Sequence, residues 1–451
     1  MVRLRPVLIS VALLSLASSA TGQTPTPSAP PQITQDELDL QSRANVVQGS
    51  GARALGMGGA FLARADDATA ASWNPAGLSY LRLPEVSFVY TGGRLDSLEV
   101  TTASRKDDQR EGRTPDFFAA AYPFDLGRVS GSAQVSFQRI ISFQGDRTIE
   151  ETFVDSATGQ VNTVPTSVTS EGGFDVVTLG TGVAVRSNLR IGATINRWFN
   201  GYHQTLDRET VRAGFPGHTT QEFDYDFSGW NFNLGLVWSP HANLNLGLVY
   251  KSAFTADVQL NKSRTDLTVP PSTNQANSLQ NPITLDFPAA IGMGASWRPR
   301  SRLTISADYT RTAWSEGEIH NYFTLPAGAP GPGTPTTYPS LPYPSLDTNP
   351  ARPQHDTVQI RGGAEFVFIF GRVKVPVRAG AFSDRQYFQA SDGTPPHFTG
   401  LTAGTGIVIG PVLLDVAFIK EWGDYRDADA AAVSVDAKRL VGSVIFRFPR
   451  H

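Results

Sequence analysis

Cysteine is absent from this sequence of 451 residues, and long hydrophobic runs are absent beyond its N-terminus. Without cysteine, the chain has no disulfide framework and no thiol that could carry a lipid anchor. A transmembrane helix needs roughly 20 consecutive apolar residues, and the best interior run is the short stretch Phe366–Phe370. The sequence therefore excludes membrane-spanning helices.

An excess of charge of either sign is also missing. The chain has 38 Lys and Arg against 41 Asp and Glu, for a net charge of −3. It therefore offers neither a basic stripe for nucleic acid nor an acidic tail. We expect no nucleic-acid partner.

Catalytic and metal-binding signatures are missing as well. None of the seven histidines forms an H-E-x-x-H pair, and there is no G-x-S-x-G motif. The adjacent carboxylates Asp66 and Asp67 lack nearby His or Cys residues, which favours a hydrogen-bonded turn or an ion pair over a metal site. The sequence predicts no enzyme, no metal and no cofactor. A hydrolase that assembles a Ser and a His from distant strands is the enzymatic alternative.

The N-terminus has the three parts of a secretory signal peptide. Met1–Pro6 is basic, Val7–Ala17 is largely apolar, and small residues occupy positions 18–22. We expect a signal peptide over 1–22 and export to the bacterial envelope.

The next stretch predicts a periplasmic extension over 23–50. Its first part, residues 24–31, is rich in proline and is typical of an extended spacer. A capping box at Thr34–Glu37 then predicts a short helix over 35–48.

From Glu85 onward the sequence alternates apolar and polar residues with a period of two, which indicates strands. For example, Ile305 and Tyr309 fall on one face, while Asp308 falls on the other. The 42 glycines and 31 prolines are typical of a chain with many turns. About fourteen strands are predicted: 85–92, 116–124, 128–140, 173–185, 189–200, 221–239, 242–258, 282–298, 302–318, 356–370, 372–383, 398–409, 411–422 and 438–448.

The connections between these strands alternate in length. Tight turns, as at 125–127 and 186–188, alternate with long polar loops. Short turns on the periplasmic rim and long loops on the extracellular rim are typical of outer-membrane barrels. The long loops are expected at 93–115, 141–172, 201–220, 259–281, 319–355, 384–397 and 423–437.

A sheet in lipid must close, because every unpaired backbone group at an edge would cost several kcal/mol. We therefore predict an all-β fold, a transmembrane antiparallel β-barrel of about 14 strands over 85–448. It would lie in the bacterial outer membrane with both termini in the periplasm. A soluble sandwich or propeller is the alternative, and the signal peptide and the loop asymmetry oppose it.

The segment before the barrel, residues 51–84, is rich in glycine and contains an Asn74-Pro75 turn, so it can fold back into the lumen as a compact plug. Its sequence GARALGMGGAFLARADDATAASWNPAGLSYL, residues 51–81, resembles the N-terminal hatch of the FadL/TodX family of outer-membrane transporters. Later segments, among them LDFPAAIGMGASWRPRSRLTISADYTRTAWSE, resemble the family in order, so the similarity covers most of residues 51–448.

This resemblance implies passive uptake of long-chain fatty acids, aromatic hydrocarbons or similar lipophiles. The substrate would enter an apolar pocket and leave sideways into outer-membrane lipid when the hatch shifts. It also implies an opening at a kink in the third strand, where Gly131 is the weak point. The residues expected to form or gate the hatch are Gly58, Gly59, Asp66, Asp67, Asn74, Pro75 and Ala76. Those that would contact a lipophilic small molecule, or alternatively pack the hatch into the barrel, are Leu55, Met57, Phe61, Leu62, Trp73 and Leu78.

Two further expectations concern partners. The last strand resembles the C-terminal strands that the barrel assembly machinery recognises, with its final aromatic residue at Phe448. A noncatalytic role in protein secretion or surface attachment is the main alternative function, with the 23–50 extension and the Pro-rich loop as docking surfaces. A general porin is the third alternative, which the plug opposes.

Overall fold

The structure is a computed structural model that describes residues 49–101, 104–127, 129–154, 161–212, 215–268, 275–320, 341–342, 355–386, 390–426 and 431–449. The predicted signal peptide, nearly all of the extension with its helix over 35–48, and most of the Pro-rich loop lie outside these residues. Within the described ranges, no helix combines the length and the hydropathy that a bilayer crossing requires.

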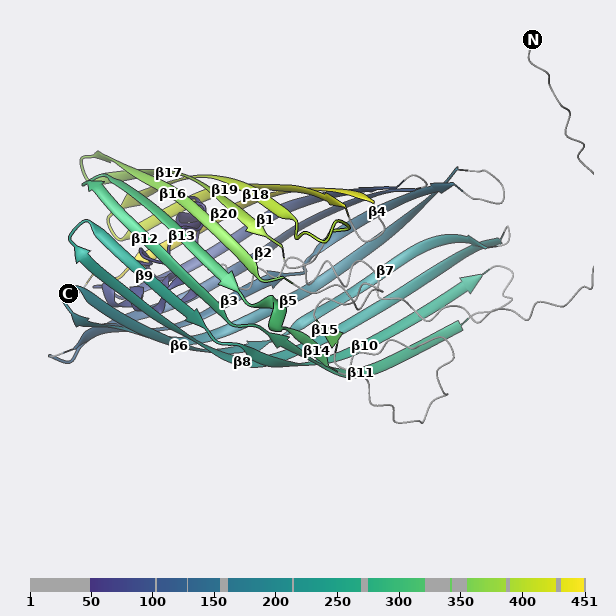
Figure 1. Ribbon diagram of the computed structural model, residues 1–451, viewed down its shortest axis with the longest axis horizontal. Helices are drawn as coiled ribbons and strands as arrows, with labels where there is room; N and C mark the ends of the chain where they lie inside the picture. The colour runs from purple at the N-terminus through teal and green to yellow at the C-terminus, as the bar shows by residue number, and fades with distance from the viewer. Residues whose placement is uncertain are drawn as a thin grey trace, which may run out of the picture. The chain divides into compact units, whose positions relative to one another are not determined.

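The chain forms one antiparallel sheet that closes on itself (Figure 1). The first strand pairs with the last along its whole length, from Glu85 opposite Arg447 to Val100 opposite Ala432. The strands are β1 (Glu85–Val100), β2 (Ser104–Asp125), β3 (Ser130–Ser142), β4 (Gly145–Val154), β5 (Val161–Arg186), β6 (Leu189–Phe199), β7 (Gly201–Arg212), β8 (Phe215–His241), β9 (Leu244–Lys251), β10 (Phe254–Thr268), β11 (Gln275–Phe287), β12 (Ala290–Arg300), β13 (Leu303–Thr312), β14 (Glu318–His320), β15 (Leu341–Pro342), β16 (Thr357–Phe370), β17 (Val373–Arg385), β18 (His397–Ile409), β19 (Val412–Arg426) and β20 (Ala432–Arg447).

The wall has 14 strands, which confirms the predicted fold class. Five pairs of elements, β3 with β4, β6 with β7, β9 with β10, β11 with β12 and β13 with β14, each continue a single wall strand across a short break. β15 is a two-residue strand that pairs with β14 alone.

The two faces of the wall have opposite character, as the alternation predicted. On β13, the outward side chain of Ile305 is 42% exposed, whereas the inward side chains of Thr304, Ser306 and Asp308 are buried. An apolar exterior around a polar lumen is what a barrel in hydrocarbon requires. Large apolar side chains of this exterior include Phe88, Tyr122, Leu179, Trp230, Ile360 and Leu440.

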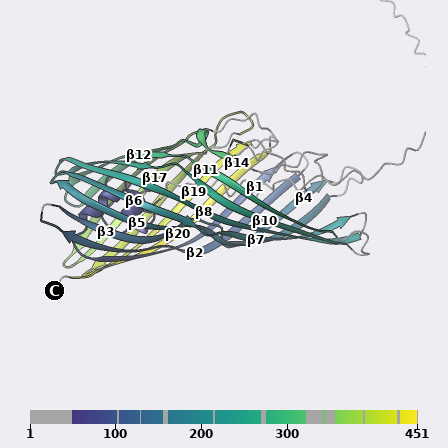
Figure 2. The same cartoon turned by 90° about the horizontal axis from the view of Figure 1, so that it is seen from below.

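At one rim of the barrel, short turns join neighbouring strands (Figures 1 and 2). Residues 187–188 join β5 to β6, and residues 410–411 join β18 to β19. β1 begins and β20 ends at this turn rim, and the opposite rim is called the loop rim below. Connections on the loop rim are not all long, because residues 101–103 separate β1 from β2 and residues 213–214 separate β7 from β8. The predicted alternation of short and long connections therefore holds only in part, and the periplasmic position of the termini stays a prediction.

Several stretches predicted as long loops are strand instead. Much of 141–172 is β4 and the first half of β5, and most of 201–220 is β7 and the start of β8. These predictions were wrong for a physical reason. Alternating hydrophobicity marks a strand only where one face meets an apolar medium, and these polar extensions lack that alternation.

Candidate functional site

Residues 49–84, here called the inner segment, lie within the barrel lumen near the turn rim (Figure 1). They form two short helices, α2 (Ala52–Leu55) and α3 (Ala70–Trp73), and the 3-10 helix η1 (Pro75–Tyr80). η1 packs against β3, β5, β6 and β8, and α2 packs against β18, β19 and β20. The segment therefore touches the wall on opposite sides of the lumen.

Asn74 connects the inner segment to itself and to the wall. The following proline disfavours helical geometry at this position, and Asn74 is extended, with φ −144° and ψ 108°. Its Oδ1 accepts a hydrogen bond from the Ala76 N–H at 3.1 Å, which caps η1. Its Nδ2 donates to the Leu62 carbonyl at 2.8 Å and to the Leu236 carbonyl of β8 at 3.2 Å.

Gly58 and Gly59 occupy positions where the backbone has a positive φ. Their φ angles are 69° and 74°, in the left-handed region that favours glycine. The Gly58 N–H donates to the Thr402 hydroxyl of β18 at 2.9 Å, and Arg361 of β16 donates to the Gly58 carbonyl at 3.1 Å.

Glycines of the wall let the inner segment approach at backbone distance. A Cβ on Gly235 would lie 2.1 Å from Oδ1 of Asn74, and one on Gly192 would lie 2.3 Å from the Pro75 carbonyl carbon. On the other side of the lumen, a Cβ on Gly380 would lie 2.3 Å from the backbone nitrogen of Gly58. The members of this glycine girdle are Gly182, Gly192, Gly235, Gly247, Gly363 and Gly380.

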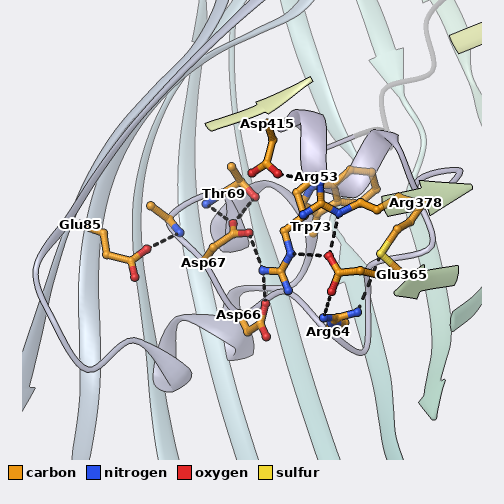
Figure 3. A network of polar contacts seen from close by, with 12 residues as sticks. Arg53, Arg64, Asp66, Asp67, Thr69, Trp73, Glu85, Glu365, Arg378 and Asp415 are labelled. Atoms are coloured by element: carbon orange, nitrogen blue, oxygen red, sulfur yellow. Dashed lines mark hydrogen bonds and ion pairs between the residues drawn. The ribbon is translucent and has the colours of Figure 1, made fainter. Parts of the chain in front are cut away.

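A buried charge network fixes the segment to the wall (Figure 3). Arg53 Nη1 donates to Asp66 at 2.6 Å and to Asp67 at 3.1 Å. Its Nε lies 3.6 Å from Glu365 of β16, which also accepts hydrogen bonds from Arg64 of the segment and from Arg378 of β17. Glu365 therefore joins the segment to the wall.

Both Arg53 and Asp66 are held in their charged forms. Burial lowers the pKa of Arg53, but the carboxylates of Asp66, Glu365 and Asp67 outweigh this effect and raise the pKa well above its usual value. Burial raises the pKa of Asp66, but Arg53 and Arg64 outweigh it and hold the pKa below its usual value. Asp66 and Asp67 thus serve an ion pair whose partner is the segment's own Arg53. Among the described residues, no group of three His, Cys, Asp or Glu residues is placed to hold a metal ion.

The six predicted apolar contact residues pack the segment into the barrel. Phe61, Leu62, Trp73 and Leu78 belong to one buried cluster with Leu55 against it, and Met57 is fully buried. None of the six lines the larger interior cavity described next.

That cavity, of about 310 Å³, lies between the inner segment and the loop rim, bordered by β1 to β3 and β17 to β20. Its lining mixes apolar, cationic and acidic side chains, among them Ile140, Phe143, Phe398, Arg139, Arg439, Asp116 and Glu421. The cavity reaches the break between β3 and β4 at residues 143–144. Gly131, by contrast, is paired in register on both sides, opposite Phe124 and Val183.

An aromatic cluster lines another part of the lumen, and sequence reasoning missed it. Ring centroids of Phe174 and Phe227 are 4.2 Å apart, and those of Phe254 and Phe287 are 4.9 Å apart. Phe174 and Phe227 lie within the continuous strands β5 and β8, and the other rings of the cluster lie at or beside breaks in wall strands. The signal in the sequence was the recurrence of Phe and Trp near slips of the alternation. The aromatic cluster comprises Phe143, Phe174, Trp198, Phe227, Phe254, Phe287 and Trp314.

A smaller cavity, of about 40 Å³, lies between the aromatic cluster and the inner segment. Ala71 and Ser72 of the segment line it together with Trp198 and Phe254 of the cluster. Ile140 borders both cavities, so the two spaces are neighbours in the lumen.

Solved structures of bacterial transporters share this architecture. A FadL homologue of Pseudomonas aeruginosa superposes with a TM-score of 0.61 at 13% identity, over 89% of this chain and 99% of that chain. The P. putida toluene transporter TodX gives 0.57 at 14% identity, over 90% and 100%. The Ralstonia pickettii toluene transporter TbuX gives 0.54 at 17% identity, over 89% and 99%. The resemblance predicted from the sequence is therefore confirmed at the level of the fold.

Sequence comparisons add one assignment. No curated protein matches the chain. A protein-family model described as BamG matches residues 48–325. This match spans more than half of the chain, and the protein therefore belongs to the BamG family.

Proposed function

We propose that this protein is an outer-membrane channel for passive uptake of hydrophobic compounds. The observation that carries the proposal is the cavity of about 310 Å³, which combines apolar and cationic walls above a lumen-filling segment. Ligand sites for lipophiles are concave and mostly apolar, with a few polar groups that fix orientation. The barrel would insert with its termini in the periplasm, and its last strand, ending at Phe448, would be read by the assembly machinery.

The charges of the cavity suggest how an amphiphile would be oriented. Arg139 is already engaged by Asp175, with bonds of 2.7 and 2.9 Å. Arg439 pairs with Glu421 at the longer distance of 3.5 Å and also interacts with the charge of Asp116. In this proposal Arg439 binds the carboxylate of a long-chain fatty acid, and Phe143 and Phe398 contact its chain.

The exit route in this proposal is lateral. The break between β3 and β4 borders the cavity, which makes it a better candidate for the opening than Gly131 within its paired ladder. The inner segment is the hatch, with Asn74, Pro75 and Ala76 as its turn. The glycine girdle and the buried ion pairs favour a local shift of this hatch over its departure from the lumen.

Uptake by cells that lack their own fatty-acid transporter tests the proposal. Cells expressing the full chain should take up labelled oleate but not a labelled sugar of similar size. Arg439→Gln should reduce oleate uptake roughly tenfold at limiting concentration, because a charge-assisted contact is lost. Toluene uptake should not change, and Arg372→Gln at an exposed turn is the matched control.

Other results would contradict the proposal in different ways. Entry of the sugar would indicate an open porin. Failure of every lipophile to enter through a correctly inserted barrel would exclude the channel and favour the noncatalytic role in secretion.

A further inference from the structure

A groove of about 610 Å³ lies on the outer face of the wall where β1, β2, β19 and β20 adjoin. Its floor is formed by two outward-facing glycines. An added Cβ on Gly442 would have no heavy atom within 4 Å, and one on Gly92 would meet only the Arg113 side chain, at 3.7 Å. The groove therefore exists because side chains are missing at these two positions.

The side of the groove toward the turn rim is apolar. Tyr90, Val416, Phe418 and Leu440 line it, and all four side chains are exposed on the barrel exterior. Gly442 pairs with Tyr90 on one side and with Val416 on the other, so the apolar side chains flank the glycine floor.

The side toward the loop rim carries a row of cations. Lys438 lies directly opposite Arg94 of β1 and directly opposite Lys420 of β19. Like charges placed opposite each other on neighbouring strands destabilise a sheet. Carboxylates near the row offset this repulsion, and an anion bound beside the row would add to that effect.

The carboxylates near this row balance its three cations and leave Arg113 as the source of the groove's net positive charge. Asp96 lies 2.8 Å from Arg94, and Glu111, the single acidic residue of the groove lining, lies 3.2 Å from Arg94. Asp436 lies 3.1 Å from Lys420 and 3.2 Å from Lys438. Arg113, beside the glycine floor, makes no ion pair with any residue in the described part of the chain.

We propose that this groove binds one phosphate-bearing membrane lipid. An acyl chain lies over Gly92 and Gly442 against the apolar side chains, and the phosphate is bound by Arg113, Arg94 and Lys438. Anionic headgroups gain favourable energy from each nearby Lys or Arg, and the acyl chain gains from apolar contact. The site lies outside the lumen and does not depend on the proposed transport function.

Native mass spectrometry of the delipidated, detergent-purified full chain tests this inference. With dioleoylphosphatidylglycerol as the probe, the wild type should retain one lipid per barrel, and with zwitterionic dioleoylphosphatidylcholine it should retain about tenfold less. The double variant Arg113→Gln/Lys438→Gln should weaken retention of the anionic lipid by roughly tenfold or more.

A matched pair of glycine variants tests the location. Gly442→Leu fills the groove and should abolish retention. Gly362→Leu introduces the same side chain at another outward glycine with no heavy atom within 4 Å of its Cβ, and should leave retention unchanged. Heat stability of each variant shows whether the barrel is folded.

Three results would overturn the inference. Equal retention of the anionic and the zwitterionic lipid would show that the cations do not contribute to binding. Equal loss of lipid retention in the Gly442→Leu and Gly362→Leu variants would show that the lipid does not bind in the groove. Complete competition by inorganic phosphate would indicate a site for the free anion and not for a lipid.

Discussion

Asn74 is fully buried, and its side-chain amide makes three hydrogen bonds. Asn74→Ala removes hydrogen bonds from two carbonyls and one N–H, and each buried group that stays unsatisfied costs about 1 to 3 kcal/mol. We expect the inner segment to lose protection from hydrogen exchange while the wall keeps it. Asn243→Ala, in an exposed turn, is the control and should change nothing. Loss of protection throughout the barrel would contradict the local role.

Asp66 makes the attachment of the inner segment depend on pH. Its pKa in the folded protein is below the ordinary value of 3.8, so the stabilisation from its charge is complete above about pH 3.8. That stabilisation is lost as the pH falls through the lowered pKa. The difference in exchange protection between the wild type and Asp66→Asn should be constant from pH 7 to 5 and should shrink below pH 3.8. Asp66→Asn should be weaker at pH 7 and should show a smaller fall, and an identical fall in both proteins would contradict the assignment.

At this scale the sequence was informative in part. It singled out Asn74 and the Asp66–Asp67 pair, because an Asn-Pro turn and adjacent carboxylates need partners. It could not identify Arg53 as the partner of the two aspartates, or Glu365 as the wall residue that pairs with Arg53 and Arg64. Glu365 lies 301 residues beyond Arg64, and only the closure of the barrel brings them together. The roles of Phe61 and Leu78 could not be predicted, because an apolar side chain is compatible both with packing and with substrate contact.

In the glycine girdle, replacement of glycine by alanine should have the opposite of its usual effect in a strand. Glycine inside a strand normally weakens it, so replacement by alanine should be neutral or stabilising. Gly235→Ala should instead displace the inner segment, because its Cβ would lie 2.1 Å from Oδ1 of Asn74 and 2.8 Å from Cδ of Pro75. Limited proteolysis should then cut within residues 49–84. Gly362→Ala faces outward into open space and should leave the segment resistant.

The strands themselves could be predicted where lipid acts on them. Period-two alternation located β16, β18 and β19 closely, since one face of each meets an apolar medium. The breaks between β3 and β4 and between β6 and β7 were not predicted, because they follow from bends at single positions. Asn200, between β6 and β7, has a φ of 74°, and its side chain donates a hydrogen bond to Asp175 at 2.7 Å. No sequence pattern predicts this arrangement.

Closure of the barrel depends on the pairing of the first strand, β1, with the last strand, β20, which meet at the turn rim. The Phe448 N–H donates to the Pro84 carbonyl at 2.9 Å, and Arg447 pairs with Glu85 at 2.7 Å. If the assembly machinery reads this end, Phe448→Ala should reduce the amount of heat-modifiable barrel in outer membranes several-fold. Phe370→Ala, at an exposed aromatic of another turn, is the control. Equal yields for both variants would contradict recognition of Phe448.

Five of the seven tryptophans fall into two groups, one in the aromatic cluster and one on the barrel exterior. Trp198 and Trp314 are buried in the lumen, whereas Trp230, Trp238 and Trp297 are exposed on the exterior. Brominated acyl chains quench indole fluorescence only on contact, so brominated bilayer lipid would darken the exterior set and spare the interior one. A brominated fatty acid that reached the lumen would darken Trp198 and Trp314 instead. Quenching of the protein's own tryptophan fluorescence would therefore show whether a lipophile lies in the lumen or in the bilayer.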